Sequence, residues 1–168
     1  MVKKLPKCSE GGYTIVEALV AILILSIGIL PSLSVILRAN DFSLAIKNNL
    51  VAANLAQEGV EVVRAIRDAN WLNGRSFDSG LSNGTYRVQW NSSALVVDSN
   101  PAPLILIDGQ GLYSYSSGMA TVYTRKIFIT KIDPGGCNCE LKVVAEITWL
   151  EKKRSRVITV EVHLFNWN

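Results

Sequence analysis

The sequence predicts an α+β protein in which a long N-terminal helix packs on an antiparallel β-sheet. Two observations indicate this fold class. Charged residues are absent between Ala18 and Leu37, and helical periodicity continues from this run to about residue 70. After residue 74, short β-branched and aromatic runs alternate with turns rich in Gly, Ser and Asn, as in successive antiparallel strands. Such a helix and sheet bury their apolar faces against one another.

The uncharged run is long enough to cross a membrane. Its twenty residues span roughly 30 Å as a helix, which is about the thickness of the hydrocarbon core of a bilayer. A core helix of a soluble protein usually keeps a polar stripe, whereas this run is apolar on every side except at Ser26, Ser32 and Ser34. We therefore expect residues 13–38 to form a single membrane-spanning helix.

Basic residues precede this run and predict its orientation. The net charge of the chain is +3, and three lysines against one glutamate place most of it before Gly12. By the positive-inside rule this end stays in the cytoplasm and the chain after Arg38 is translocated. The small remaining charge predicts no nucleic-acid partner.

The leader differs from a secretory signal peptide, which is cut after its apolar stretch and loses it. Here the predicted cut precedes the stretch, where Gly11 and Gly12 mark an abrupt change from polar to apolar sequence. Cutting between Gly12 and Tyr13 would remove residues 1–12 as a leader peptide and keep the helix.

These residues resemble the class III leader of type IV pilins and type II secretion pseudopilins. In that family a short basic leader ends in Gly, followed by an aromatic residue, a short run, Glu at the fifth mature position and an apolar helix. Gly12, Tyr13 and Glu17 match these positions, with Tyr13 where Phe is usual. The resemblance covers about residues 3–38, and the stretch 18–30 is most similar to V-type minor pilins or I-type pseudopilins.

The resemblance implies a pilin fold and a set of partners. A prepilin peptidase would cut after Gly12 and methylate the new amino group of Tyr13. An inner-membrane assembly platform with its ATPase would then join the subunit to other pilin subunits. The precursor would be a single-pass protein of the cytoplasmic membrane. The product would be an extracellular or periplasmic filament for adhesion, motility or DNA uptake.

Glu17 stands at the head of the apolar helix. A carboxylate buried in lipid or in an apolar filament costs several kcal/mol unless it is paired. The resemblance implies that Glu17 serves assembly by docking on the N-terminal amine of a neighbouring subunit. The alternative is that Glu17 lies among lipid headgroups, where the helix dipole favours a negative charge.

The rest of the helix has two predicted parts. Gly28 and Pro31 weaken residues 27–31, so we expect a bend or local melting, and the resemblance implies unwinding there on assembly. Residues 39–72 form the amphipathic half, with one apolar stripe for the globular domain and a second for neighbouring subunits. The first stripe is Leu44, Val51, Leu55, Val62 and Ile66, and the second is Ile46, Leu50, Ala53 and Val60.

Residues 73–168 are predicted to form the antiparallel sheet of the globular domain. The last two strands alternate most clearly, with Lys152, Lys153 and Arg154 as a charged hairpin turn between them. The predicted strands are 84–90, 94–98, 104–108, 121–132, 140–150 and 155–166.

Two cysteines, Cys137 and Cys139, would remain after loss of the leader. Thiols one residue apart supply at most half of a four-ligand zinc site, so we expect neither a metal nor a cofactor. Translocation permits a Cys137–Cys139 disulfide, which would mainly stiffen the loop, and a reduced pair is the alternative.

Catalysis is the function that the sequence supports least. It contains no nucleophile motif or phosphate-binding loop, and His163 is alone on a strand face. The sequence favours a major or minor subunit of a type IV pilus. Two alternatives stay open, a type II secretion pseudopilin and a membrane-anchored binding or sensor module that remains in the bilayer. A leader that stays uncut in cells would favour the membrane-anchored module.

Overall fold

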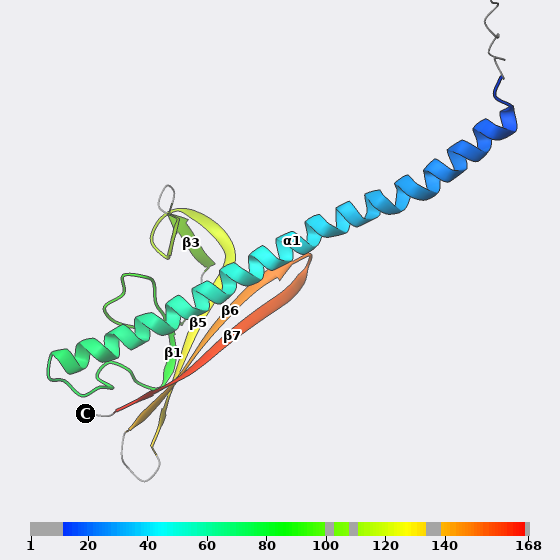
Figure 1. Cartoon of the computed structure of the whole chain (residues 1–168). Helices are drawn as coiled ribbons and strands as arrows, with labels where there is room; N and C mark the ends of the chain where they lie inside the picture. The colour runs from blue at the N-terminus through cyan, green and yellow to red at the C-terminus, as the bar shows by residue number, and fades with distance from the viewer. Residues whose placement is uncertain (1–11, 100–102, 108–110, 134–138, 167–168) are drawn as a thin grey trace, which may run out of the picture. The chain divides into compact units, whose positions relative to one another are not determined.

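The structure is a computed structural model that describes residues 12–99, 103–107, 111–133 and 139–166. The chain forms two compact units, Met1–Leu44 and Ala45–Asn168. Helix α1 (Ile15–Leu72) runs through both units, and the strands of the described residues belong to the second (Figure 1). The predicted α+β class is confirmed, because α1 in the second unit packs on an antiparallel sheet.

The sheet is built around its longest strand, β5. The strands are β1 (Gly84–Arg87), β2 (Val96–Val97), β3 (Pro103–Ile107), β4 (Leu112–Ser114), β5 (Met119–Ile132), β6 (Glu140–Glu151) and β7 (Arg154–Phe165). One edge of β5 pairs with β6, which pairs with β7. The other edge pairs with β3 along its first part and with β1 further along. β3 also pairs with β4, and β1 also pairs with β2.

The predicted strands are present near their expected positions, with two differences. β1 ends at Arg87 because the next residues form a turn, in which Ser92 N donates to Gln89 O at 2.9 Å. The short strand β4 was not predicted, since its three residues run directly into the turn-like Ser116 and Ser117.

The loop of the hairpin between β6 and β7 contains two residues. Glu151 pairs with Arg154, so the loop is Lys152 and Lys153 alone, with φ angles of 46° and 67°. Positive φ at both residues is what a type I′ turn requires, and its twist matches that of the strands. Arg154, predicted to lie in the turn, instead begins β7.

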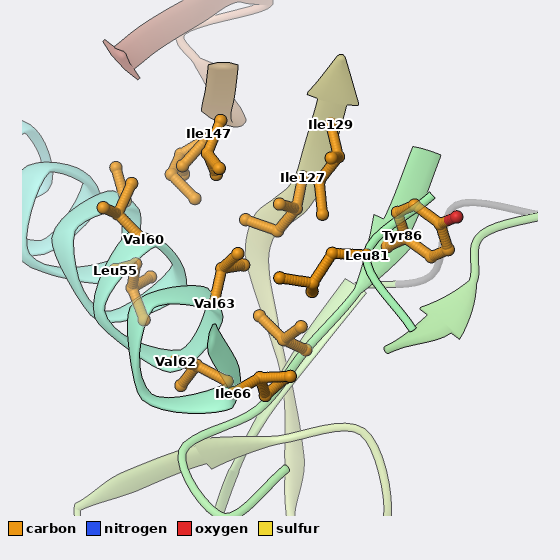
Figure 2. Packing of buried hydrophobic residues seen from close by; sticks show 14 of the residues in the cluster. Leu55, Val60, Val62, Val63, Ile66, Leu81, Tyr86, Ile127, Ile129 and Ile147 are labelled. Carbon is orange, nitrogen blue, oxygen red and sulfur yellow. The ribbon is translucent and has the colours of Figure 1, made fainter. Parts of the chain in front are cut away.

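The core lies between one face of the sheet and the second part of α1 (Figure 2). Alternate residues of β5 and β6 point towards the helix, as the period of two requires. Burial of each large apolar side chain stabilises the fold by roughly 1.5–3 kcal/mol. Buried apolar residues of α1 are Ala52, Leu55, Ala56, Val60, Val62, Val63 and Ile66.

The two predicted stripes of the helix need one correction each. Leu44 of the first stripe is 59% exposed, and Val60 of the second is only 4% exposed and belongs to the core. Ile46 and Leu50 are exposed, as the second stripe predicts. The buried face widens around Val60 because the neighbouring Gly59 lets the helix approach the sheet closely. A Cβ on Gly59 would lie 2.7 Å from Ile127 Cδ1.

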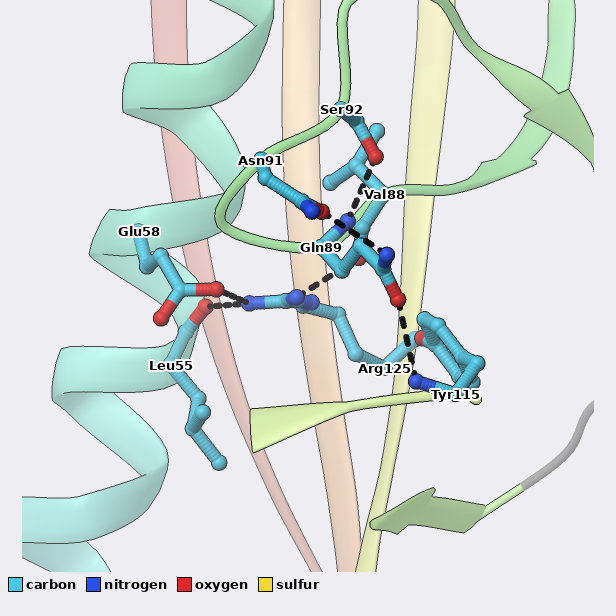
Figure 3. A network of polar contacts seen from close by, with 8 residues as sticks. All are labelled: Leu55, Glu58, Val88, Gln89, Asn91, Ser92, Tyr115 and Arg125. Atoms are coloured by element: carbon cyan, nitrogen blue, oxygen red, sulfur yellow. Dashed lines mark hydrogen bonds and ion pairs between the residues drawn. The ribbon is translucent and has the colours of Figure 1, made fainter. Parts of the chain in front are cut away.

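A fully buried arginine lies beside this close approach (Figure 3). Arg125 of β5 donates from Nη1 to Leu55 O at 2.8 Å and to Glu58 Oε1 at 2.9 Å. Its Nη2 donates to Val88 O at 2.6 Å, while its Nε has no hydrogen-bond partner among the described residues. One guanidinium therefore links α1, β5 and the segment after β1.

We predict that Arg125→Met lowers the stability of the second unit. Two buried carbonyl oxygens would lose a charged donor, at about 1–3 kcal/mol for each acceptor left unpaired. Lys126→Met is the control, since Lys126 is the next residue of β5 and lies half-exposed on the opposite face. Chemical unfolding of the detergent-solubilised chain measures both variants. An unchanged midpoint for Arg125→Met would mean that desolvating the guanidinium costs as much as its hydrogen bonds contribute.

Candidate functional site

The candidate site is the start of α1 with the residues directly before it. The helix begins at Ile15, and Thr14 Oγ1 accepts a hydrogen bond from Glu17 N at 3.2 Å. Thr14 is therefore the N-cap and Glu17 the third helical residue, which is the spacing of a capping box. At this position the helix dipole favours the carboxylate of Glu17.

Gly12 and Tyr13 precede the cap in non-helical, exposed backbone, and the Tyr13 side chain is 87% exposed. A Cβ on Gly12 would meet no atom within 4 Å. Packing within the described chain therefore gives no reason for glycine at this position. The peptide bond between Gly12 and Tyr13 is accessible to another molecule.

The helix that follows presents its apolar side chains to the exterior on all sides. In the first unit these include Ile15, Leu23, Ile29 and Leu37, each at least 60% exposed. Among the helices of the described residues, α1 is the one long and apolar enough to cross a membrane. A soluble protein rarely leaves an apolar surface of this extent in water.

The serine hydroxyl groups of the apolar run donate hydrogen bonds to backbone carbonyl oxygens of the same helix. Ser26 Oγ donates to Ile22 O at 2.7 Å, and Ser32 Oγ donates to Gly28 O at 2.8 Å. Such internal bonds let hydroxyl groups lie in hydrocarbon without an unpaired donor. They also support the helix around Pro31, where a hydrogen bond of the backbone is missing.

A bend or local melting was predicted at residues 27–31; local melting is not present, and the bend stays a prediction. α1 is unbroken from Ile15 to Leu72, with Pro31 inside it. A Cβ on Gly28 would meet no atom within 4 Å, so this glycine also lacks a packing reason among the described residues. Unwinding at Gly28 and Pro31 on assembly stays a prediction.

The predicted disulfide concerns the loop before β6. Cys139 is disulfide-bonded and lies next to the first residue of that strand. Cys137 lies outside the described residues, so its pairing with Cys139 stays a prediction.

The second unit offers little for catalysis in its described part. There, no group of three or more His, Cys, Asp and Glu residues is placed to hold a metal ion. A cavity of about 230 Å³ lies beside Arg87, Gln89, Ser92 and Tyr115. Gln89 and Ser92 are engaged in internal bonds, with Gln89 Oε1 accepting from Tyr115 N at 3.1 Å and Ser92 Oγ accepting from Gln89 N at 2.9 Å.

His163, which the sequence places on a strand face, belongs to a polar cluster on the outer face of β6 and β7. Its Nδ1 contacts Glu140, its Nε2 lies 3.1 Å from Glu161 Oε1, and Lys142 Nζ lies 2.8 Å from Glu161 Oε2. Hydrogen bonds to Glu140 and Glu161 raise the pKa of His163. Hydrogen bonds from Lys142 and His163 lower the pKa of Glu161. The cluster lies at the surface of the sheet, with His163 and Glu161 exposed.

Comparison with known families identifies the N-terminal segment. Residues 7–33 match the family described as the prokaryotic N-terminal methylation motif. This motif is the class III signal of type IV pilins, which confirms the resemblance seen in the sequence. No curated protein and no solved structure matches the chain significantly.

The motif and the fold point to the same class of protein. A class III signal precedes a long apolar helix, and the helix continues into a pilin-like α+β unit. The methylation motif thus supports a type IV pilin-like prepilin, and the N-terminal apolar helix fits a membrane-anchored precursor.

We predict that His163, the one histidine of the chain, titrates above its ordinary pKa of about 6.5. Because the pKa is raised in the folded state, the stabilisation is complete below the unfolded pKa and is lost as the pH rises through the folded pKa. Glu161→Gln should lower the pKa of His163, and Glu146→Gln, on the same face of β6, should not. NMR titration of the imidazole signals measures the pKa of His163 in the unchanged chain and in each of the two variants. A titration unaffected by Glu161→Gln would contradict the contact.

Proposed function

We propose that this chain is a prepilin subunit that prepilin peptidase cuts between Gly12 and Tyr13 and methylates on the new amino group of Tyr13. The product then assembles as a major or minor subunit of a type IV pilus. The supporting observation is the arrangement at the start of α1. An exposed Gly–Tyr bond without packing contacts directly precedes a Thr14-capped helix whose surface is apolar on all sides.

Glu17 is the residue that we assign to assembly. Cleavage places a new ammonium group on Tyr13, four residues before Glu17 and at the positive end of the helix dipole. The carboxylate of a neighbouring subunit neutralises this ammonium group when apolar helices pack side by side in a staggered array. At 4 Å and an effective dielectric constant of 20, such a pair is worth about 4 kcal/mol before desolvation is subtracted.

The apolar helix serves two environments in succession. In the precursor it spans the cytoplasmic membrane with the basic leader inside and the second unit translocated. In the filament the same side chains pack against helices of other subunits. The exposed Ile46 and Leu50 extend this apolar surface into the second unit. The inner-membrane platform and other pilin subunits are the partners that this route requires.

A type II secretion pseudopilin is the second candidate. The similarity of residues 18–30 to I-type pseudopilins favours it, and cleavage, methylation and docking would use the same residues. A membrane-anchored binding or sensor module would share the helix and keep residues 1–12.

We predict that the mature protein begins at N-methylated Tyr13. Gly12→Ala and then Gly12→Leu should progressively block cutting, because the site of the peptidase must accommodate the side chain. Gly28→Ala is the matched control, since Gly28 also has open space at its Cβ position but lies away from the cut. Mass spectrometry of the N-terminus measures processing. An intact leader in a host with active peptidase would exclude both filament functions.

We predict that Glu17→Val leaves membrane insertion and cleavage intact and strongly reduces incorporation into filaments. Thr14→Val separates this role from helix capping, because it removes the cap, at about 1 kcal/mol, and keeps the carboxylate. The Thr14→Val subunit should be incorporated nearly normally. The measurement is the amount of each variant subunit in sheared filaments. Normal incorporation of Glu17→Val would show that the carboxylate only anchors the helix at the headgroups.

A further inference from the structure

A partly open cavity of about 230 Å³ lies beside β1 and β2 in the second unit. Three segments of the chain form its walls, namely the end of β1 with the turn that follows, β2, and the residue directly after β4. Sites that enclose a drug-sized molecule measure roughly 300–1,000 Å³, so this cavity has room for a single small ring. The lining residues are Arg87, Val88, Gln89, Ser92, Val96 and Tyr115.

Hydrogen bonds hold the turn after β1 in place (Figure 3). Ser92 N donates to Gln89 O at 2.9 Å, and Ser92 Oγ accepts from Gln89 N at 2.9 Å. The side chain of Gln89 donates from Nε2 to Asn91 Oδ1 at 2.8 Å and accepts at Oε1 from Tyr115 N at 3.1 Å. The polar wall of the cavity is therefore formed before a ligand enters, and a preformed site binds at a smaller entropic cost.

This polar wall keeps unused hydrogen-bonding capacity. An amide side chain carries two donor hydrogens and two lone pairs on its oxygen, and Gln89 uses one of each within the described residues. The hydroxyl group of Ser92 accepts one hydrogen bond there and donates none. The wall therefore matches a ligand whose polar groups both donate and accept, as hydroxyl groups do.

Arg87 adds charged donors whose charge is already compensated. Its Nε lies 3.3 Å from Oδ1 of Asp98, whose side chain is completely buried, and its guanidinium carbon lies 5.5 Å from the centre of the Tyr115 ring. The side chain of Arg87 is 26% exposed, and its Nη groups donate no hydrogen bond to the described residues. The attraction of an anion to Arg87 is offset by repulsion from Asp98, whereas a neutral hydroxyl group can accept from the Nη groups.

The rest of the lining is apolar. Val96 of β2 is 55% exposed, and the ring of Tyr115 is partly buried against the core. Trp90, which follows Gln89 in the turn, is a further aromatic residue and is 46% exposed. A sugar ring carries hydroxyl groups at its edge and C–H groups on its face. Aliphatic and aromatic side chains beside amide and guanidinium groups suit both parts of such a ring.

We propose that this cavity binds one ring of a neutral saccharide. The Nη groups of Arg87, the amide of Gln89 and the hydroxyl group of Ser92 bond to the hydroxyl groups of the sugar. Val96 and the ring of Tyr115 contact its C–H face. The site lies wholly within the second unit, so ligand binding requires neither the cut at Gly12 nor assembly.

The test uses the full chain in phosphatidylcholine nanodiscs, because detergents with glucoside or maltoside headgroups would compete for the site. The probes are the methyl glycosides of glucose, galactose, mannose and N-acetylglucosamine. Saturation-transfer difference NMR should show binding of at least one of them. Val96→Phe should abolish this binding, because the larger side chain fills the cavity. Val97→Phe is the matched control, since Val97 is the neighbouring residue of β2, is 67% exposed and points to the other face of the strand.

Arg87→Lys tests the guanidinium group. Lysine keeps a positive charge beside Asp98 but loses the planar set of donors. The affinity should fall by about tenfold, which is the contribution of one hydrogen bond from a charged donor. Thermal unfolding of each variant shows whether the second unit is folded.

Three results would overturn the site. The first is an unchanged chain that binds none of the four glycosides. The second is undiminished binding by folded Val96→Phe or, where that variant does not fold, by Arg87→Lys. The third is binding of methyl glucuronide in preference to methyl glucoside, which would assign the cavity to anions. None of these results bears on cleavage or filament assembly, which the N-terminal variants test separately.

Discussion

The buried guanidinium of Arg125 is the constraint on which the second unit depends. It bonds to the backbone of α1 and to the backbone after β1, so it fixes the helix, the central strand and the connecting segment together. An arginine at zero exposure is costly unless its donors are used, and Glu58 supplies the compensating charge. Gly59 makes the arrangement possible, since a side chain there would displace Ile127 and the stem of Arg125.

The contact of α1 with Arg125 and the sheet divides the helix into two parts with different surroundings. From Ala52 onward its buried residues have partners in the sheet, whereas the apolar residues before Leu44 have none within their own unit. The second part of α1 is stabilised by contacts within the chain, whereas the described residues of the first part bury no apolar surface of their own. The first part is suited to an apolar environment, because Thr14 caps its start and the hydroxyl group of Ser26 donates to a backbone carbonyl of the same helix.

Sequence reasoning succeeded where the signal is local and failed where it depends on contacts between elements. The class III signal and the apolar run are contiguous, and the alternation of β6 and β7 is regular, so each could be predicted. The Thr14 cap is equally local and was not predicted. Arg125 was missed although Tyr123, Ile127 and Ile129 place it on the core face, because its charge suggests an exposed position. Val60 was assigned to the wrong face, since only the fold shows how closely Gly59 brings the helix to the sheet.

The two roles considered for Glu17, headgroup anchor and docking residue, follow from one geometry. As the third residue of α1, the carboxylate lies in the turn where the dipole stabilises it by about 0.3–1 kcal/mol at an exposed position. Among lipid headgroups the charge needs no further partner, because water solvates the carboxylate. In a dry helix bundle the interaction with the dipole is much smaller than the cost of burying an unpaired carboxylate. In the proposed docking, an ammonium group on Tyr13 of a neighbour, which would exist only after cleavage, would offset that cost. In the proposed function, processing would therefore control whether Glu17 can leave the membrane surface, and this would couple assembly to the cut at Gly12.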